Sequence, residues 1–205
     1  MKRLVIILLV AAALALAAEP LRLQDSIEAM GTTYIVVAYA EEEETLDQGM
    51  QAAFAEVSRL DRMLSNYRPD SEWSKVNREA AKGPVPVSEE LFRLLEYCRD
   101  VNRLSEGTFD ISVGPLMKVW GFYRGTGRLP AEREVAEAVR KVGFDAVELD
   151  AARRTVRFRK PGMELDPGGI GKGYAVDRMI EKLKDAGIGS AMISAGASSI
   201  YGLGA

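Results

Sequence analysis

The sequence predicts an α+β fold in which helices flank a mixed sheet, and three observations lead to this expectation. Apolar residues recur at helical spacing over residues 45–64 and 88–105. Short apolar or β-branched runs, clearest at residues 33–40, are typical of strands. Apolar and charged fractions of 47% and 28% are globular values, and 205 residues suffice for one domain with a substantial core.

The elements follow from local signals along the chain. Serine is a favourable N-cap, and glycine a favourable residue just past a C-terminus. Helices are expected at 45–64, 72–77, 88–105, 130–142 and 171–186. The expected N-caps of the first three are Thr45, then Asp70 or Ser71, then Ser88. Gly107, Gly143 and Gly187 follow the last three helices. Strands are expected at 33–40, 147–149 and 155–159 as a hairpin, 163–165, 190–194 and 198–203.

The segment most informative about function is 166–177, DPGGIGKGYAVD. An aspartate ends an apolar run, and a glycine-rich turn with one lysine then leads into a predicted helix. Glycine lets backbone N–H groups approach an anion, and a helix N-terminus attracts negative charge. The pattern suits a phosphate group. From glycine spacing alone, a tight strand-to-helix turn without a ligand remains an equal alternative.

Two common phosphate motifs do not fit this segment. A P-loop requires a glycine where Asp166 stands and a hydroxyl residue where Gly173 follows Lys172. A dinucleotide fingerprint requires G-x-G-x-x-G, whereas Gly169 and Gly171 begin a G-x-G-x-G pattern. The segment therefore belongs to neither class.

Composition narrows the chemistry further. The chain has no histidine, which excludes Ser-His-Asp and Cys-His catalysis and the usual zinc sites, so a bound metal would have oxygen ligands. The net charge of −3 gives no electrostatic reason to expect nucleic acid as a partner. Cys98 is the only cysteine and lies in a helical pattern, where we expect a small core residue.

The N-terminus has the features of a secretory signal. Lys2 and Arg3 precede an apolar run over residues 4–18, and Ala15-Leu16-Ala17 offers small residues to a signal peptidase. We expect residues 1–17 to be removed and residues 18–205 to act outside the cytoplasm, with an uncleaved anchor as the lesser alternative.

Other segments combine small, aromatic and acidic residues. The motif MGT at 30–32 allows a close ligand approach or a simple turn, and LSNYRPDSE at 64–72 offers Tyr67 to a planar ring. In GTFDISVGPL at 107–116, Asp110 is equally a pocket or a core residue, and Trp120 and Phe122 are expected to be packing anchors. The small-residue turn at 194–199 resembles a ligand rim.

Taken in order, these segments resemble the FAD:protein FMN transferases, the ApbE-type flavin transferases. The resemblance spans about residues 25–205 and depends on the order of motifs that are individually weak. The motifs are MGT at 30–32, LSNYRPDSE at 64–72, GTFD at 107–110 with GPL at 114–116 and WGF at 120–122, the segment 166–177, and the Ala195-Gly196 turn.

The resemblance implies an extracytoplasmic, Mg²⁺-dependent enzyme that moves FMN from FAD to a Thr or Ser of an acceptor flavoprotein and releases AMP. Some relatives instead hydrolyse FAD. The implied partners are FAD and the acceptor, at the outer face of the inner membrane or in the periplasm. The implied FAD contacts are Met30, Tyr67, Thr108, Phe109, Asp110, Asp166 and Lys172, and the implied magnesium ligand is the Gly169 carbonyl.

The chain also departs from the family pattern. The family's later D-P-x-[ST]-G stretch with its histidine, and the Ala-Asp…Thr segment that completes the magnesium site, have no counterpart here. Ala197 stands where many relatives have glycine, and Pro167 where leucine is common. We therefore expect the N-terminal two-thirds of a transferase domain, with an incomplete sheet and no transfer by these residues alone. The alternative functions are those of an FAD-binding or inactive fragment without transfer activity and of an FAD pyrophosphatase.

Overall fold

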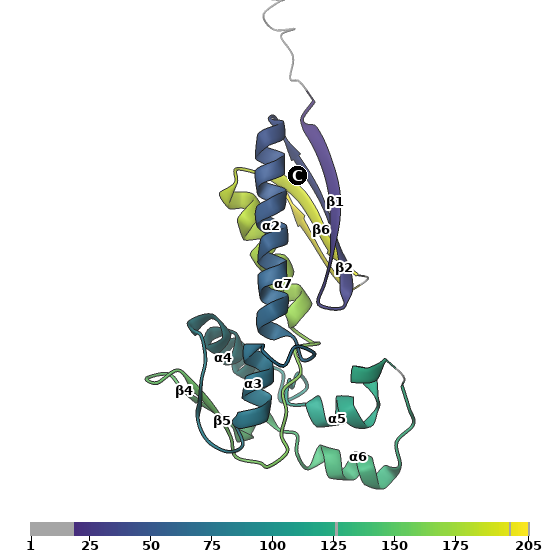
Figure 1. Ribbon diagram of the computed structural model, residues 1–205, viewed down its shortest axis with the longest axis vertical. Helices are drawn as coiled ribbons and strands as arrows, with labels where there is room; N and C mark the ends of the chain where they lie inside the picture. Colours follow the sequence, from purple (N-terminus) through teal and green to yellow (C-terminus); the bar gives the residue numbers. More distant parts are fainter. Residues whose placement is uncertain (1–18, 126, 197, 205) are drawn as a thin grey trace, which may run out of the picture.

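The structure, a computed structural model, describes residues 19–125, 127–196 and 198–204. The expected signal peptide at 1–17 lies outside the described residues. The α+β class is confirmed, with two antiparallel sheets in place of one mixed sheet. Figure 1 shows one sheet beside the long helix α2 and the other in the lower half of the molecule.

The larger sheet has four strands in the order β1-β2-β6-β7. Two helices pack on one of its faces, and buried residues of β2 and β6, such as Val36 opposite Ile193, point toward them. The strands are β1 (Leu21–Ala29), β2 (Thr32–Ala40), β6 (Ser190–Ala195) and β7 (Ser199–Leu203), and the helices are α2 (Glu43–Leu64) and α7 (Gly171–Asp185).

The smaller sheet has the order β3-β5-β4. Figure 1 shows shorter helices beside this sheet and others that project to the right. Its strands are β3 (Val85–Pro86), β4 (Val147–Asp150) and β5 (Thr155–Phe158), with helices α3 (Glu72–Glu79), α4 (Glu89–Leu104), α5 (Gly114–Val119) and α6 (Glu132–Val139) and 3-10 turns at Phe122–Arg124 and Phe144–Ala146. None of the helices in the described part of the chain is long and apolar enough to cross a membrane.

Several local predictions are confirmed. The Ser71 hydroxyl accepts from the backbone N–H of Ser74 and caps α3, and Ser88 caps α4 in the same way. Gly187 follows α7 with a φ of 87°, a left-handed conformation that glycine adopts without strain. Cys98 is fully buried, as expected for a small core residue.

Other predictions of elements are wrong, and one strand was not predicted. Helix α2 begins at Glu43 rather than after Thr45, because two glutamates in its first turn complement the helix dipole. Residues 163–165 form no strand; only Glu164 makes a bridge, to Val113. Strand β1 was not predicted, since Asp25 interrupts its apolar alternation and the strand is secured by pairing with β2.

Candidate functional site

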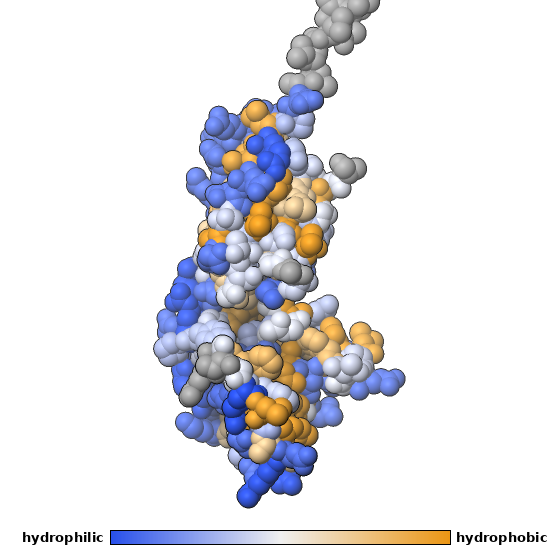
Figure 2. Space-filling model, turned by 90° about the vertical axis from the view of Figure 1, so that its right-hand side faces the viewer, coloured by the Kyte–Doolittle hydropathy of each residue, from blue (hydrophilic) through white to orange (hydrophobic). Residues whose placement is uncertain are grey.

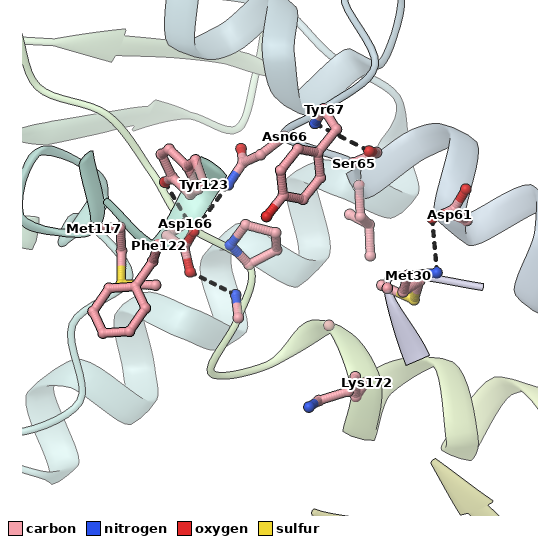
Figure 3. A pocket seen from close by; sticks show the side chains of 15 residues that line it. Met30, Asp61, Ser65, Asn66, Tyr67, Met117, Phe122, Tyr123, Asp166 and Lys172 are labelled. Carbon is pink, nitrogen blue, oxygen red and sulfur yellow. Dashed lines mark hydrogen bonds between the residues drawn. The ribbon is translucent and has the colours of Figure 1, made fainter. Parts of the chain in front are cut away.

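A cavity of about 250 Å³ lies where the β1–β2 turn, the end of α2 and the start of α7 meet. Figure 3 shows Lys172 on the α7 side of this cavity and Tyr67 on the opposite side. The lining residues are Met30, Gly31, Asp61, Leu64, Ser65, Asn66, Tyr67, Met117, Phe122, Tyr123, Asp166, Pro167, Gly168, Gly171 and Lys172.

Asp166 organises the turn that the sequence singled out. Its carboxylate is buried and accepts three hydrogen bonds: from the Gly168 backbone N–H at 2.8 Å, from Asn66 Nδ2 at 2.9 Å and from the Tyr123 hydroxyl at 2.8 Å. A Cβ atom at residue 168 would come within 2.7 Å of Asp166 Oδ1, so the turn requires glycine there. The carboxylate therefore fixes the path of the chain into α7.

The start of α7 offers backbone donors to an anion. Within the described residues, no acceptor bonds the N–H groups of Lys172 and Gly173, whereas the Gly171 N–H already donates to the Pro167 carbonyl at 2.7 Å. No carboxylate in the described part of the chain lies within salt-bridge distance of the Lys172 ammonium. Free donors and an unpaired positive charge at a helix N-terminus suit a phosphate group.

Side chains of α3 form hydrogen bonds with the backbone immediately before Asp166. Asn77 donates to the Leu165 carbonyl at 2.9 Å and accepts from the Leu165 N–H at 2.8 Å. The indole of Trp73, which is buried, donates to the same carbonyl at 3.0 Å. These partners lie 88 and 92 residues from Leu165 in the sequence, so no local spacing indicates them.

The start of α7 is also tied to α2 and α4. The Tyr174 hydroxyl donates to Glu90 Oε1 at 2.9 Å, and Glu90 pairs with Arg59 at 2.7 Å. Arg59 also pairs with Glu56 at 2.7 Å. Hydrogen bonding from Arg59 lowers the pKa of Glu90, which keeps this carboxylate charged at neutral pH. The network holds Tyr174, two residues after Lys172, against the rest of the molecule.

Aromatic side chains form the other wall. The rings of Tyr67 and Tyr123 meet edge to face, with centroids 6.2 Å apart. Tyr67 is 70% exposed and Phe122 is 56% exposed, so both present ring surface at the mouth of the cavity. Burial, followed by the charge of Asp166, raises the pKa of Tyr123. Its hydroxyl therefore remains a donor to Asp166 at neutral pH.

The expectation that Trp120 and Phe122 are packing anchors is wrong. Trp120 is 37% exposed and is the C-cap residue after α5, and Phe122 opens the 3-10 turn that follows Gly121. Gly121, between the two aromatic residues, has a left-handed φ of 75°. Figure 2 looks onto the side from which α5 and α6 project, and hydrophobic residues gather in its lower half.

Four of the predicted contact residues line the cavity together: Met30, Tyr67, Asp166 and Lys172. The other three lie outside its lining. Thr108 is exposed, and Asp110 accepts from the backbone N–H groups of Ser112 and Phe144 at 2.7 and 3.1 Å. Phe109 lies behind the glycine turn, since a Cβ atom at residue 169 would be 3.3 Å from its ring.

The sequence reasoning did not single out four residues of this site: Asp61, Asn66, Asn77 and Tyr123. Asn66 and Asn77 stand inside segments that it noted, but nothing in the local pattern shows that their amides reach Asp166 and Leu165. The described residues contain no group of three or more His, Cys, Asp or Glu side chains placed to hold a metal ion.

The fold and the cavity define an α+β protein in which the helix N-terminus that carries Lys172 lies opposite an aromatic wall, an arrangement that suits an anionic ligand with a ring system. A family model described as the ApbE family matches residues 30–205. The chain belongs to the ApbE family.

Curated relatives agree with this assignment. The chain is 30% identical to an FAD:protein FMN transferase of Haemophilus influenzae, over 96% of this chain and 60% of the relative. It is 28% identical to one of Klebsiella pneumoniae, over 85% of this chain and 54% of the relative. The chain thus spans about 60% or less of the length of these relatives.

Solved structures show the same fold. The ApbE protein of Thermotoga maritima superposes with a TM-score of 0.79 at 27% identity, covering 86% of this chain and 57% of its own. The apo form of the flavinyl transferase ApbE of Pseudomonas stutzeri gives 0.80 at 25% identity, covering 90% and 62%.

Proposed function

We propose that these residues belong to an enzyme that transfers FMN from FAD to a Thr or Ser hydroxyl of an acceptor flavoprotein and releases AMP. One observation carries the proposal: the cavity places Lys172 and helix N–H groups, all without a partner among the described residues, opposite exposed aromatic rings. A pyrophosphate attached to a flat ring system matches both walls. The names of the relatives, FAD:protein FMN transferase, support the same substrate.

In the proposed reaction, the acceptor hydroxyl oxygen forms a bond to the phosphorus of the FMN half. The bond between this phosphorus and the bridging oxygen breaks, and AMP leaves with that oxygen while the hydroxyl proton passes to a base. Lys172 and the N–H groups of Lys172 and Gly173 would bind the pyrophosphate and stabilise negative charge as the bond breaks. Tyr67 and Phe122 would pack against a ring of the dinucleotide.

Magnesium is part of the proposal. The Gly169 carbonyl, which accepts no hydrogen bond from a described residue, would be one ligand, and pyrophosphate oxygens would be others. A bound Mg²⁺ would neutralise charge on the pyrophosphate. Asp166 is already engaged by three donors, so the described residues alone do not complete a magnesium site, and we assign no step to the ion.

We also propose that the protein acts outside the cytoplasm, at or near the outer face of the inner membrane. The support is the basic and apolar N-terminal sequence, in which Ala15-Leu16-Ala17 precedes the expected cleavage point. Mass spectrometry of the mature N-terminus tests this, and a protein that retains Met1 in the cytoplasm would contradict it.

Lys172→Met tests the phosphate assignment. The variant keeps the aliphatic stem and removes the charge, so a charge-assisted contact worth roughly 1.5–3 kcal/mol is lost. We expect FAD affinity, measured by calorimetry, to fall about tenfold or more while the melting temperature changes little. Lys184→Met, at an exposed position near the other end of α7, is the matched control. Unchanged affinity in the Lys172 variant would refute the assignment.

A second assay separates transfer from its rivals. AMP release is measured from FAD with Mg²⁺, with and without an acceptor peptide. AMP formed only with the acceptor, together with a flavin-labelled peptide, supports transfer. AMP formed without it identifies a pyrophosphatase, and FAD binding without AMP identifies a binding module.

A further inference from the structure

The β1–β2 turn holds a methionine in an unfavourable conformation. Ala29 pairs with Thr32, which leaves Met30 and Gly31 as a two-residue turn with φ angles of 51° and 72°. Both residues are left-handed, a geometry in which Asn-Gly is preferred and a side chain such as methionine is strained. The hairpin itself gives no reason for methionine at this position.

Asp61, near the C-terminal end of α2, anchors this turn. Its Oδ1 atom accepts the Met30 backbone N–H at 2.9 Å, across 31 residues of sequence. Its Oδ2 atom lies 3.4 Å from Nε of Arg68, which follows Tyr67 in the aromatic wall. One carboxylate therefore joins the hairpin turn to the loop that carries Tyr67.

The strained turn directs the Met30 side chain at the start of α7. A Cβ atom at Gly171 would come 3.0 Å from the methyl carbon of Met30, next to Lys172. The sulfur accepts from the Tyr34 hydroxyl at 3.3 Å. Burial, followed by the charge of Asp61, raises the pKa of Tyr34 to about 12, so this hydroxyl stays protonated at neutral pH.

We propose that Asp61 is a positioning residue of the nucleotide site, acting through Met30 by fixing the strained turn that places the thioether beside the phosphate-binding end of α7. The inference rests on the proposed function, because the ligand of the site is taken to be FAD. Asp61 itself need not touch the ligand.

A double-mutant cycle with FAD as the probe tests this role. Asp61→Leu is made in the original sequence and in Met30→Gly, and the dissociation constant for FAD is measured by calorimetry. Alone, Asp61→Leu should weaken binding about five- to tenfold. In the Met30→Gly background it should add less than about twofold, since glycine adopts the turn unaided and has no thioether to place. Asp47→Leu, at an exposed position of α2, is the control.

Amide hydrogen exchange provides a readout that does not depend on FAD. The Met30 amide should exchange about tenfold faster or more in Asp61→Leu, while central amides of β2 keep their protection. If Asp61→Leu fails to fold, Asp61→Asn replaces it: the amide oxygen still accepts but without charge, so the Met30 amide should exchange severalfold faster in a folded protein.

The outcomes are distinguishable. The role of Asp61 would be overturned, and the proposed function left standing, by either of two results. In one, Asp61→Leu binds FAD as tightly as the unmodified protein. In the other, the losses of FAD affinity add fully in the double variant. Unchanged exchange at Met30 in a folded Asp61 variant would overturn it as well. Failure of the unmodified protein to bind FAD would overturn the proposed function, and the positioning role with it.

Discussion

Two turns contribute to the lining of the cavity and are built in opposite ways. The Asp166 turn is held by its own first side chain, and glycine stands at residue 168, where a Cβ atom would collide. The β1–β2 turn has methionine where glycine or asparagine would be relaxed, and it depends on Asp61 for its anchor. Besides its distant donors Asn66 and Tyr123, the first turn therefore has a hydrogen bond within its own residues, whereas the second is anchored by a contact 31 residues away in the sequence.

The largest effect that separates the two turns is expected from Gly168→Ala. Its Cβ atom would lie 2.7 Å from Asp166 Oδ1, so the carboxylate or the turn must move and the hydrogen bonds from Tyr123 and Asn66 are disturbed. We expect a loss of about 2–3 kcal/mol in the free energy of unfolding and a large loss of FAD affinity.

Urea denaturation and calorimetry measure the two effects of Gly168→Ala. The matched control is Gly173→Ala, because a Cβ atom there meets nothing within 4 Å and alanine favours the helix. Its free energy of unfolding should rise by about 0.5–1 kcal/mol. Equal stability of both variants would show that the Asp166 turn is not sterically specified.

The same contrast explains which parts of the site the sequence predicted. Caps such as Ser71 and Ser88 and the glycine turn before α7 act within a few residues, and the structure has them where expected. The partners of Asp166 and Leu165 lie 43 to 100 residues away, so their roles depend on the tertiary fold.

The exposure of Trp120 and Phe122 was also not predicted from the sequence. Apolar rings are most often core residues, but Trp120 and Phe122, on either side of the left-handed Gly121, are 37% and 56% exposed. The glycine was visible in the sequence, whereas its φ angle of 75° was not.

A smaller effect is expected from Tyr123→Phe. The variant removes one donor to the Asp166 carboxylate and leaves those of Asn66 and Gly168 in place. We expect a loss of about 1–2 kcal/mol in the free energy of unfolding and about two- to fivefold weaker FAD binding. Tyr97→Phe, at a ring that is 57% exposed, should change neither quantity. A Tyr123 variant as stable as Tyr97→Phe would show that local bonds alone hold the turn.

The smallest effect, and the one of opposite sign, is expected from Met30→Asn. Asparagine followed by glycine is the preferred sequence for a two-residue turn with both φ angles positive, so the strain at Met30 is relieved. The free energy of unfolding should rise by about 0.5–1 kcal/mol, while FAD binding weakens because the thioether no longer lies beside Gly171.

Gly31→Ala is the control within the same turn: nothing lies within 4 Å of its Cβ position, yet alanine at a φ of 72° is strained and should lower stability. Urea denaturation measures the stability of both variants, and calorimetry measures their affinity for FAD. A Met30 variant that loses stability and affinity together would show that methionine supports the hairpin itself. A gain in stability with a loss of affinity would show that the chain keeps a strained residue for the ligand.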